Sequence, residues 1–371
     1  MVLLRPRVMP DKPPASSGAA EPRPYLTLAD VARVANVHPT TVSLALRDHP
    51  SIPVETRARI RAVAKELGYR RDPLLDAFNF HRVKNARGPR RLSMAFVVDG
   101  TATRFFGPKG YHPLVFDGAR AVAEAHNYSI EAFTIGPKDM APSRLKTILS
   151  TRGITGVLLS TFDIDTNRLE LDWEHYCTVK IESLHLAPHC DAVSSDQLQV
   201  ARTAVRRLRE YGYRRIGLAT AREDEERLSE SFRMGLLVEQ ESMPEDERVT
   251  PLVFTLADVP SLASILPDWL RDERVDVIIS NWNELLEVLP SAHIRVPDQV
   301  AFASLDVTPT MMHVGGVVQN HRLVGIRAME QLCLMAETHQ RGSPETQSIT
   351  YVPGFWRDGA SVPVRSRAWY P

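Results

Sequence analysis

From Leu92 onward, short runs rich in β-branched residues alternate with segments of helical apolar periodicity, and this alternation leaves few folds open. The strand-like runs include LSMAFVV, YSIEAFTI, GVLLS, RRIGLAT and VDVIIS. Parallel strands must be joined by a crossover, usually a helix that covers one face of the sheet, so the pattern predicts βαβ units. Because these roughly 280 residues exceed one sheet of ordinary size, we expect two doubly wound lobes.

The first 91 residues differ from this body in charge. They carry 17 Lys and Arg against 8 Asp and Glu, whereas the remaining residues carry 28 against 37. The formal net charge of zero therefore hides a basic head on an acidic body. Such a split favours a head that binds a polyanion; the alternative is a basic segment that only aids solubility.

Composition excludes several protein classes. No apolar run approaches the roughly 18–20 residues of a membrane-spanning helix, and prolines interrupt the stretch where a signal peptide would be apolar. Three scattered cysteines are too few for a disulfide scaffold or a zinc knuckle. We therefore expect a cytoplasmic, nucleoid-associated protein with no membrane contact. Residues 1–24 are rich in Pro, Ala, Gly and Ser, which predicts a disordered arm.

Residues 25–71 carry three helical signals in close succession. Thr27 begins the [ST]-x-x-[DE] pattern that caps a first helix, and Asn36 suits the left-handed turn after it. Pro39 suits the first position of a second helix, where its missing N–H has little cost. A third helix is expected over roughly residues 54–67. Two short helices across a tight turn, closed by a third, form a helix-turn-helix.

This segment resembles the DNA-binding head of the LacI/GalR family of transcription regulators. The residues that carry the resemblance are Thr27-Leu28, Asp30-Val31-Ala32, Ala35, Val37, Thr41-Val42-Ser43 and Leu67-Gly68-Tyr69. The resemblance implies that the head binds double-stranded DNA. A helix-turn-helix without a nucleic-acid role is the alternative, and the basic charge and the length of the match argue against it.

The resemblance also implies which residues meet the DNA. The second helix would lie in the major groove, and the positions that match the family's base-reading side chains are Pro39, Thr40 and Leu44. His38 stands where the family has Ser. Direct readout would then rest on the Thr40 hydroxyl and on apolar contact with thymine methyl groups. The implied phosphate contacts are Thr27, Thr41, Ser43, Thr56 and Arg57. For each Ser and Thr the alternative is a helix cap or a solvated side chain.

Residues 72–90 connect the head to the body. By position, the resemblance assigns Phe78 to the hinge side chain that wedges into the minor groove at the operator centre. An acidic Asp76 near the phosphates is unfavourable for this hinge, so the alternative is that Phe78 packs on the body. Basic residues follow Phe78 in excess, and the sequence leaves open whether they clamp phosphates or only form a linker.

The body resembles the family's periplasmic-binding-protein-like core over almost all of residues 91–371. The matching runs are DAVSSDQLQVARTAVRRLREYGYRRIGLAT, VDVIISN, IRVPDQVAFASLD and GFWRDGASV. The predicted fold class is therefore α/β, with a helix-turn-helix head, a hinge and a two-lobed, doubly wound core. We expect lobe one over residues 91–212 and 318–345 and lobe two over residues 213–317 and 346–371. The crossings between lobes are expected near residues 211–215, 305–318 and 343–350.

Polar residues after several predicted strands are candidates for a ligand cleft, because ligands of open α/β sheets lie at the carboxyl ends of strands. Carried over by position, the candidates are Asp99, Asp196, Arg227, Asn281, Trp282 and Asp306. Carboxylates and amides bind paired hydroxyl groups, which favours a sugar. Trp282 would stack on a sugar face or pack in the core, and Asp99 would reach the cleft or lie in a solvated loop.

The sequence contains none of the common hydrolase, zinc-protease, P-loop or dinucleotide-binding motifs. The cluster of His185, His189 and Cys190 matches no common metal spacing, so a polar surface turn is favoured. We therefore predict no enzymatic activity, no cofactor and no metal. The prediction is a homodimeric regulator, most simply a repressor, that binds a pseudo-palindromic operator and responds to a sugar. A purine or sugar phosphate ligand, or a sugar-binding or sugar-processing protein with an incidental head, is the alternative.

Overall fold

The computed structural model describes residues 28–46, 51–67, 69, 92–101 and 111–365. The chain divides into two compact units, Met1–Arg90 and Arg91–Pro371. The expected arm at residues 1–24, Thr27 and the hinge with Phe78 lie outside the described residues.

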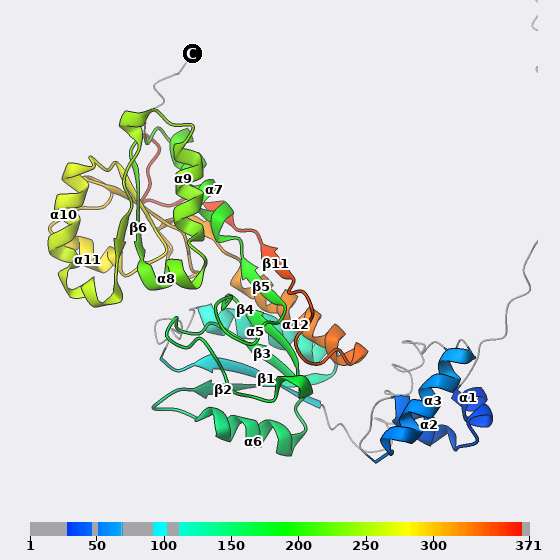
Figure 1. Cartoon of the computed structure of the whole chain (residues 1–371). Helices are drawn as coiled ribbons and strands as arrows, with labels where there is room; N and C mark the ends of the chain where they lie inside the picture. The colour runs from blue at the N-terminus through cyan, green and yellow to red at the C-terminus, as the bar shows by residue number, and fades with distance from the viewer. Residues whose placement is uncertain (1–27, 47–50, 68, 70–91, 102–110, 366–371) are drawn as a thin grey trace, which may run out of the picture. The chain divides into compact units, whose positions relative to one another are not determined.

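The described residues of the first unit form three short helices: α1 (Leu28–Val34), α2 (Pro39–Leu46) and α3 (Val54–Glu66) (Figure 1). Asn36 has φ 50°, so the turn between α1 and α2 uses the left-handed conformation that Asn tolerates. Small and branched side chains from the three helices form one apolar cluster, with Val31, Val42 and Ile60 fully buried. The helix-turn-helix expected from the caps and the apolar spacing is therefore present.

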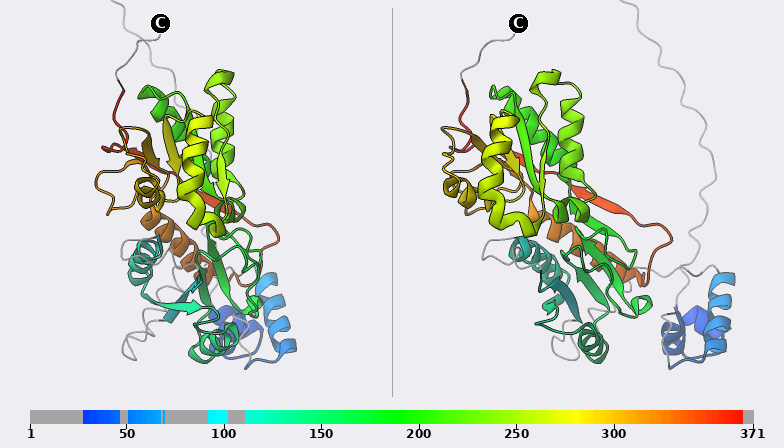
Figure 2. Two further views of the ribbon diagram at one scale, coloured as in Figure 1. Left: turned by 90° about the vertical axis from the view of Figure 1, so that its left-hand side faces the viewer. Right: turned by 60° about the vertical axis from the view of Figure 1, so that its left-hand side comes forward.

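The second unit contains two lobes, each built on a six-stranded sheet (Figures 1 and 2). The sheet of lobe one is parallel throughout, in the order β11-β5-β4-β3-β1-β2. Its strands are β1 (Leu92–Asp99), β2 (Tyr128–Ile135), β3 (Gly156–Leu159), β4 (Cys177–Ile181), β5 (Ala192–Ser195) and β11 (Ile349–Val352). Its helices are α5 (Tyr111–Ala125), α6 (Pro142–Arg152) and α12 (His321–Thr338).

Strand β1 illustrates why helices cover both faces of this sheet. Met94 and Phe96 lie in the apolar cluster that contains residues of α5 and α12, whereas Ala95 and Val97 lie in the cluster of α6. Because successive side chains of a strand point to opposite faces, a run of consecutive apolar residues needs cover on each side. The continuous apolar run MAFVV, part of the segment that predicted a parallel strand, is buried for this reason.

The sheet of lobe two has the order β12-β10-β9-β8-β6-β7, and only its edge strand β12 is antiparallel. The strands are β6 (Ile216–Ala221), β7 (Leu252–Phe254), β8 (Val277–Ser280), β9 (Ala301–Ser304), β10 (Gly315–Val318) and β12 (Phe355–Arg357). The helices are α7 (Gln197–Glu210), α8 (Arg222–Arg227), α9 (Ser231–Gln240), α10 (Leu262–Asp272) and α11 (Leu285–Ser291). Among the described residues, 3-10 helices span Glu245–Glu247 and Leu256–Ser261 in lobe two and Trp173–His175 in lobe one.

The chain passes three times between the lobes, at positions that differ from those expected. The first crossing comes before α7, because the apolar face of α7, including Val200 and Leu208, packs on the sheet of lobe two. The second lies between β10 and α12. The third follows β11, which pairs with β5 in lobe one. The expected positions near residues 211–215 and 343–350 are therefore wrong, because strand and helix patterns do not show which sheet an element joins.

Hydrogen bonds tie the three crossings to one another. The N–H of Asp196 at the first crossing donates to the carbonyl oxygen of Val352 at the third, at 2.9 Å. The side chain of Asn320 at the second donates to the carbonyl oxygen of Pro353 at the third, at 3.0 Å. The hydroxyl of Ser195 lies 3.5 Å from the carbonyl oxygen of Gln319, which joins the first crossing to the second. The crossings therefore form one connected strip between the lobes.

Candidate functional site

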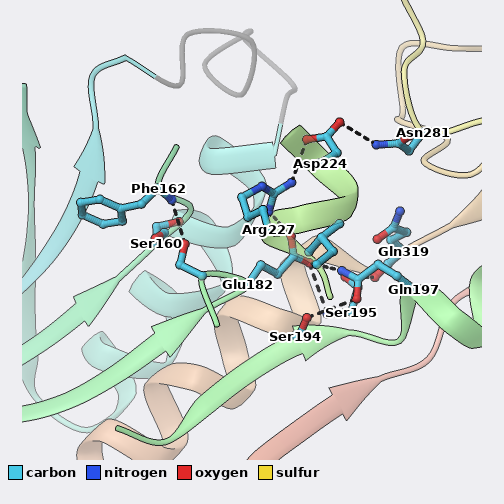
Figure 3. Close-up of polar contacts among 12 residues, drawn as sticks. Ser160, Phe162, Glu182, Ser194, Ser195, Gln197, Asp224, Arg227, Asn281 and Gln319 are labelled. Carbon is cyan, nitrogen blue, oxygen red and sulfur yellow. Dashed lines mark hydrogen bonds and ion pairs between the residues drawn. The ribbon is translucent and has the colours of Figure 1, made fainter. Parts of the chain in front are cut away.

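Polar side chains from both lobes meet at the carboxyl ends of the strands (Figure 3). In lobe one, Ser160 follows β3 and Glu182 follows β4. In lobe two, Arg227 ends α8, the helix after β6, and Asn281 follows β8. Parallel strands bring their carboxyl ends to the same edge of a sheet, so residues far apart in sequence come together here.

A row of charged and amide groups runs from lobe two into lobe one (Figure 3). The Asn281 side-chain amide donates to Asp224 at 2.9 Å, and the Arg227 guanidinium donates to the other oxygen of Asp224 at 3.2 Å. On its far side, Arg227 Nη1 lies 3.9 Å from Glu182 Oε2. Burial lowers the pKa of Arg227, and the neighbouring carboxylates, chiefly Glu182, oppose that shift. The guanidinium is thus a buried cation shared by carboxylates of both lobes.

Glu182 has a second set of partners at the first crossing. Its Oε1 accepts hydrogen bonds from the backbone N–H of Ser195 at 3.2 Å and from the side chain of Gln197 at 3.3 Å. Glu182 has φ 55°, an uncommon conformation for a residue with a side chain. Such local strain persists only where the surroundings hold the residue in place, and it is common at functional sites.

A second charged pair joins the lobes beside this row. His321, the first residue of α12, lies 2.7 Å through Nε2 from Asp306 Oδ1, which follows β9. Burial lowers the pKa of His321, but the Asp306 carboxylate outweighs burial, so the pKa is raised. The ring of Tyr111 packs edge-on against His321 with centroids 4.8 Å apart, and burial together with the charge of Glu182 raises the Tyr111 pKa well above its usual value.

His112 of α5 contributes a polar side chain from lobe one. Its Nδ1 is 3.1 Å from the hydroxyl of Ser160. Burial, assisted by the positive charge of Arg227, lowers the pKa of His112 to about 3. The imidazole is therefore neutral at physiological pH, and it presents hydrogen-bonding groups without charge.

The predicted cleft residues occupy different environments. Arg227 and Asn281 lie in the central row, and Asp306 lies in the adjacent pair with His321. Asp99 is buried, and its carboxylate accepts hydrogen bonds from Thr101, Asp163 and Thr166 of neighbouring loops. Asp196 caps α7 by accepting from the N–H of Gln199 at 3.0 Å. The solvated loop considered for Asp99 is therefore wrong.

Trp282 is buried in the apolar cluster of lobe two, and its ring packs against Phe254 with centroids 5.3 Å apart. The structure thus gives Trp282 the core packing that stood as the alternative to stacking on a sugar. The segment with His185, His189 and Cys190 was predicted to be a polar surface turn. His189 is exposed, but Cys190 is buried, so the prediction is wrong for Cys190.

The sequence did not predict five polar residues of the candidate site, namely Glu182, Asp224, Tyr111, His112 and His321. Glu182 carried a usable signal, because it directly follows the strand-like run TVKI, as Asn281 follows VDVIIS. The other four lie on helices that begin after strands or loops. Nothing in their local pattern separates them from solvated helical residues.

In the head, the residues expected to read bases lie at the start of α2. The backbone carbonyl of His38 accepts from the N–H of Thr41 at 2.8 Å, and its ring Nδ1 lies 3.3 Å from the N–H of Thr40. His38 therefore caps α2 in the place where the family has Ser. Pro39 and Thr40 are exposed, whereas Thr41, Ser43 and Leu44 are partly buried. Thr56 and Arg57, in the first turn of α3, are also partly buried.

The described residues include neither a metal-binding cluster nor a membrane-spanning helix. Over that part of the chain, no group of three or more His, Cys, Asp or Glu side chains is placed to hold a metal ion. None of the helices described is both long and apolar enough to cross a bilayer.

Comparisons with known proteins agree with both units. Residues 27–72 match the family described as bacterial regulatory proteins, lacI family. The chain is 25% identical over 194 residues to the NTD biosynthesis operon regulator NtdR of Bacillus subtilis (strain 168), a match that covers 52% of this chain and 54% of that protein. The chain thus spans about half the length of the curated relatives it matches.

Solved structures match over more of the chain. The structure described as the transcriptional regulator CelR–cellobiose complex has a TM-score of 0.56 at 21% identity, covering 90% of this chain and 98% of that one. The lac repressor dimer bound to operator and the anti-inducer ONPF has a TM-score of 0.53 at 14% identity, covering 91% and 99%. Residues 27–72 of this chain thus match the lacI family of bacterial regulatory proteins, and the chain shares the fold of these two solved regulators.

Proposed function

We propose that the protein is a repressor whose head binds a specific DNA operator and whose core binds a small molecule that controls this binding. The observation that carries the proposal is the row of Asn281, Asp224, Arg227 and Glu182, the last three of them buried, where strands of both lobes end. Buried ionisable groups with shifted pKa values, gathered where two lobes meet, are typical of a ligand site.

A sugar fits this site best. Carboxylate, amide and guanidinium groups can each bind a pair of neighbouring hydroxyls, and the neutral His112 adds a further hydrogen-bonding group. A sugar phosphate fits less well, because Arg227 already lies between the carboxylates of Glu182 and Asp224. We assign Arg227, Asn281 and Asp306 to ligand binding and add Glu182 and Asp224. The solved complex of a related fold with cellobiose supports this class of ligand.

For the head, we propose that α2 enters the major groove and that Thr40 reads bases. Two copies of the chain would bind the halves of a pseudo-palindromic operator, because a two-fold protein imposes two-fold symmetry on its site. In keeping with this role we propose a cytoplasmic, nucleoid-associated protein that binds its ligand without turning it over.

The ligand proposal is tested by a thermal-shift screen of the full chain against sugars, beginning with cellobiose and ribose, followed by calorimetry on each hit. Asn281→Ala removes the amide that bridges Asp224 and Thr220. We expect it to weaken binding by about 1.5–3 kcal/mol, the value of a hydrogen bond to a charged group.

Glu239→Gln is the matched control, because Glu239 of α9 pairs with Arg202 and Arg206 of α7. This control should bind the hit as the wild type does. Equal affinities for Asn281→Ala and the wild type would remove Asn281 from the site, and turnover of a sugar would contradict the proposal that the core only binds.

The DNA proposal is tested by selecting, from a random pool, the DNA duplexes that bind the full chain and by footprinting the protein on the selected duplexes. Thr40→Ala should lower affinity for the selected operator by about 1 kcal/mol, the net value of a hydrogen bond, and leave salt-driven binding to unrelated DNA intact. Thr147→Ala, which removes an exposed threonine of α6, serves as the control. If the selection does not enrich any particular sequence, the proposed operator binding is contradicted.

A further inference from the structure

Glu182 and Arg227 come from different lobes, and their charged groups face each other in a buried space. We propose that this pair is an interlobe clasp that holds the lobes together in the ligand-free chain, and that Glu182 couples the clasp to the strip of crossings. The inference concerns the chain without ligand, so it does not depend on which ligand the cleft takes.

The first support is the origin and burial of the two groups. Glu182 follows β4 in the sheet of lobe one, and Arg227 ends α8 in lobe two. The Nη1–Oε2 distance is 3.9 Å, and each side chain is 6% exposed. Water screens a pair buried to this degree much less than a surface pair, so the attraction across the lobes is stronger.

The second support is the unequal attachment of Arg227. Its Nη2 donates to Asp224 of its own lobe at 3.2 Å, and Asp224 is itself held by Asn281. When the lobes separate, the longer contact with Glu182 breaks while the contact with Asp224 remains. The guanidinium therefore keeps a counter-charge in the open state, which makes the clasp reversible.

The third support is that the two carboxylate oxygens of Glu182 have different partners. While Oε2 faces Arg227, Oε1 accepts from the backbone N–H of Ser195 and from the side chain of Gln197. These two residues flank the first crossing, between the end of β5 and the start of α7. Ser195 is also hydrogen-bonded to the carbonyl of Gln319 at the second crossing.

A carboxylate that loses its cation is less constrained, so opening the clasp loosens Ser195 and Gln197 as well. A ligand group that binds Arg227 or Glu182 competes with the clasp for the same charges. The clasp thereby links occupancy of the cleft to the crossings, the segments through which one lobe moves against the other. Glu182 acts in this scheme as a positioning residue.

The test compares hydrogen exchange in full-length Glu182→Gln and Glu239→Gln without ligand. Both substitutions remove one charge from a Glu–Arg pair and keep the shape of the side chain, but Glu239 pairs only with the nearby Arg202 and Arg206, on helices of lobe two. We expect Glu182→Gln to accelerate exchange about tenfold in peptides spanning residues 192–200 and 319–323, as expected when a local opening becomes easier. The control should leave these peptides unchanged.

Two outcomes overturn the clasp. Equal exchange at the crossings in both variants would mean that the pair does not hold the lobes. Faster exchange throughout the core of Glu182→Gln would mean that Glu182 only stabilises the fold. If Glu182→Gln does not fold, Glu182→Asp replaces it, because the shorter carboxylate keeps its charge while its reach to Arg227 is reduced; normal exchange at the crossings in that variant would likewise overturn the proposal.

Discussion

The two lobes share an architecture but line the cleft in different ways. In lobe two, the polar groups bond to one another: Asp224 holds Arg227, Asn281 joins Asp224 to Thr220, and Asn283 accepts from the hydroxyl of Ser304 at 2.7 Å. The face that lobe two presents is therefore organised before any ligand arrives.

Two charged side chains of lobe one pair with side chains of the other lobe. Glu182 finds its cation in Arg227 of lobe two, and His321 finds its carboxylate in Asp306 of lobe two. The uncharged His112 instead has a partner within its own lobe, Ser160. This difference indicates that hydrogen bonds within lobe two hold its polar groups in place. The charged pairs of Glu182 and His321, in contrast, require that the two lobes lie together.

The strongest test of this comparison removes Asp224, the centre of the lobe-two network. Asp224→Ala removes a carboxylate that is hydrogen-bonded to both the buried Arg227 and Asn281, so we expect a loss of about 3–5 kcal/mol in the free energy of unfolding. Glu182→Ala should cost less, about 1–3 kcal/mol, because Arg227 keeps Asp224 and the main loss is the acceptor of the Ser195 N–H. Urea unfolding measures both. A larger cost for Glu182→Ala would reverse the comparison.

The two histidines of the cleft predict opposite effects of pH on stability. The folded pKa of His112 is lowered to about 3, so the unfolded state binds the proton more tightly and stability falls as pH drops below the ordinary His value of about 6.5. The folded pKa of His321 is raised, so its contribution is present below about pH 6.5 and is lost as pH rises through the folded pKa.

Unfolding measured from pH 4.5 to 9 separates these contributions. His112→Asn should flatten the acid side of the profile, and Asp306→Asn should flatten the alkaline side because it removes the carboxylate that raises the His321 pKa. An unchanged alkaline limb in Asp306→Asn would show that the interlobe pair has no stabilising charge.

The smallest expected effect concerns single hydroxyl groups on the two faces. Thr220→Val removes the donor to Asn281 Oδ1, a bond of 3.0 Å, with little change of volume. Its expected cost is about 0.5–1.5 kcal/mol. Ser160→Ala removes the partner of His112 and should cost a similar amount. Because Asn281 belongs to a network, we expect Thr220→Val to weaken ligand binding as well. Ligand affinity unchanged by Thr220→Val would separate Asn281 from that network.

How far the sequence predicts the structure differs between the two units. The turn at Asn36 and the three described helices of the head follow from contacts within a few residues, so local patterns were sufficient. The parallel sheets of the core were also predicted, because continuous apolar runs require cover on both faces. The crossings were misplaced, since the pairing of β11 with β5 joins residues more than 150 positions apart.

In the candidate site, too, local sequence patterns predict some features and not others. Asn281 and Asp306 could be predicted because each follows a strand that is visible in the sequence. Arg227 was proposed as a site residue only because of the family resemblance. Neither the strand pattern nor the resemblance showed whether Trp282 packs in the core, where it contacts Phe254. Asp224 and His321 lie on helices whose polar residues look solvated until the second lobe covers them.

The sequence by itself determined a basic helix-turn-helix head, a parallel α/β core in two lobes and the strand ends at which polar groups gather. These features depend on charge, on local hydrogen bonds and on the period of apolar residues, all of which are written along the chain. Only the tertiary structure decided that Glu182 meets Arg227 and that His321 meets Asp306. Such pairs depend on which sheet each strand joins and on how the lobes approach. Burial at this place lowers the pKa of Arg227, and the Asp306 carboxylate raises that of His321.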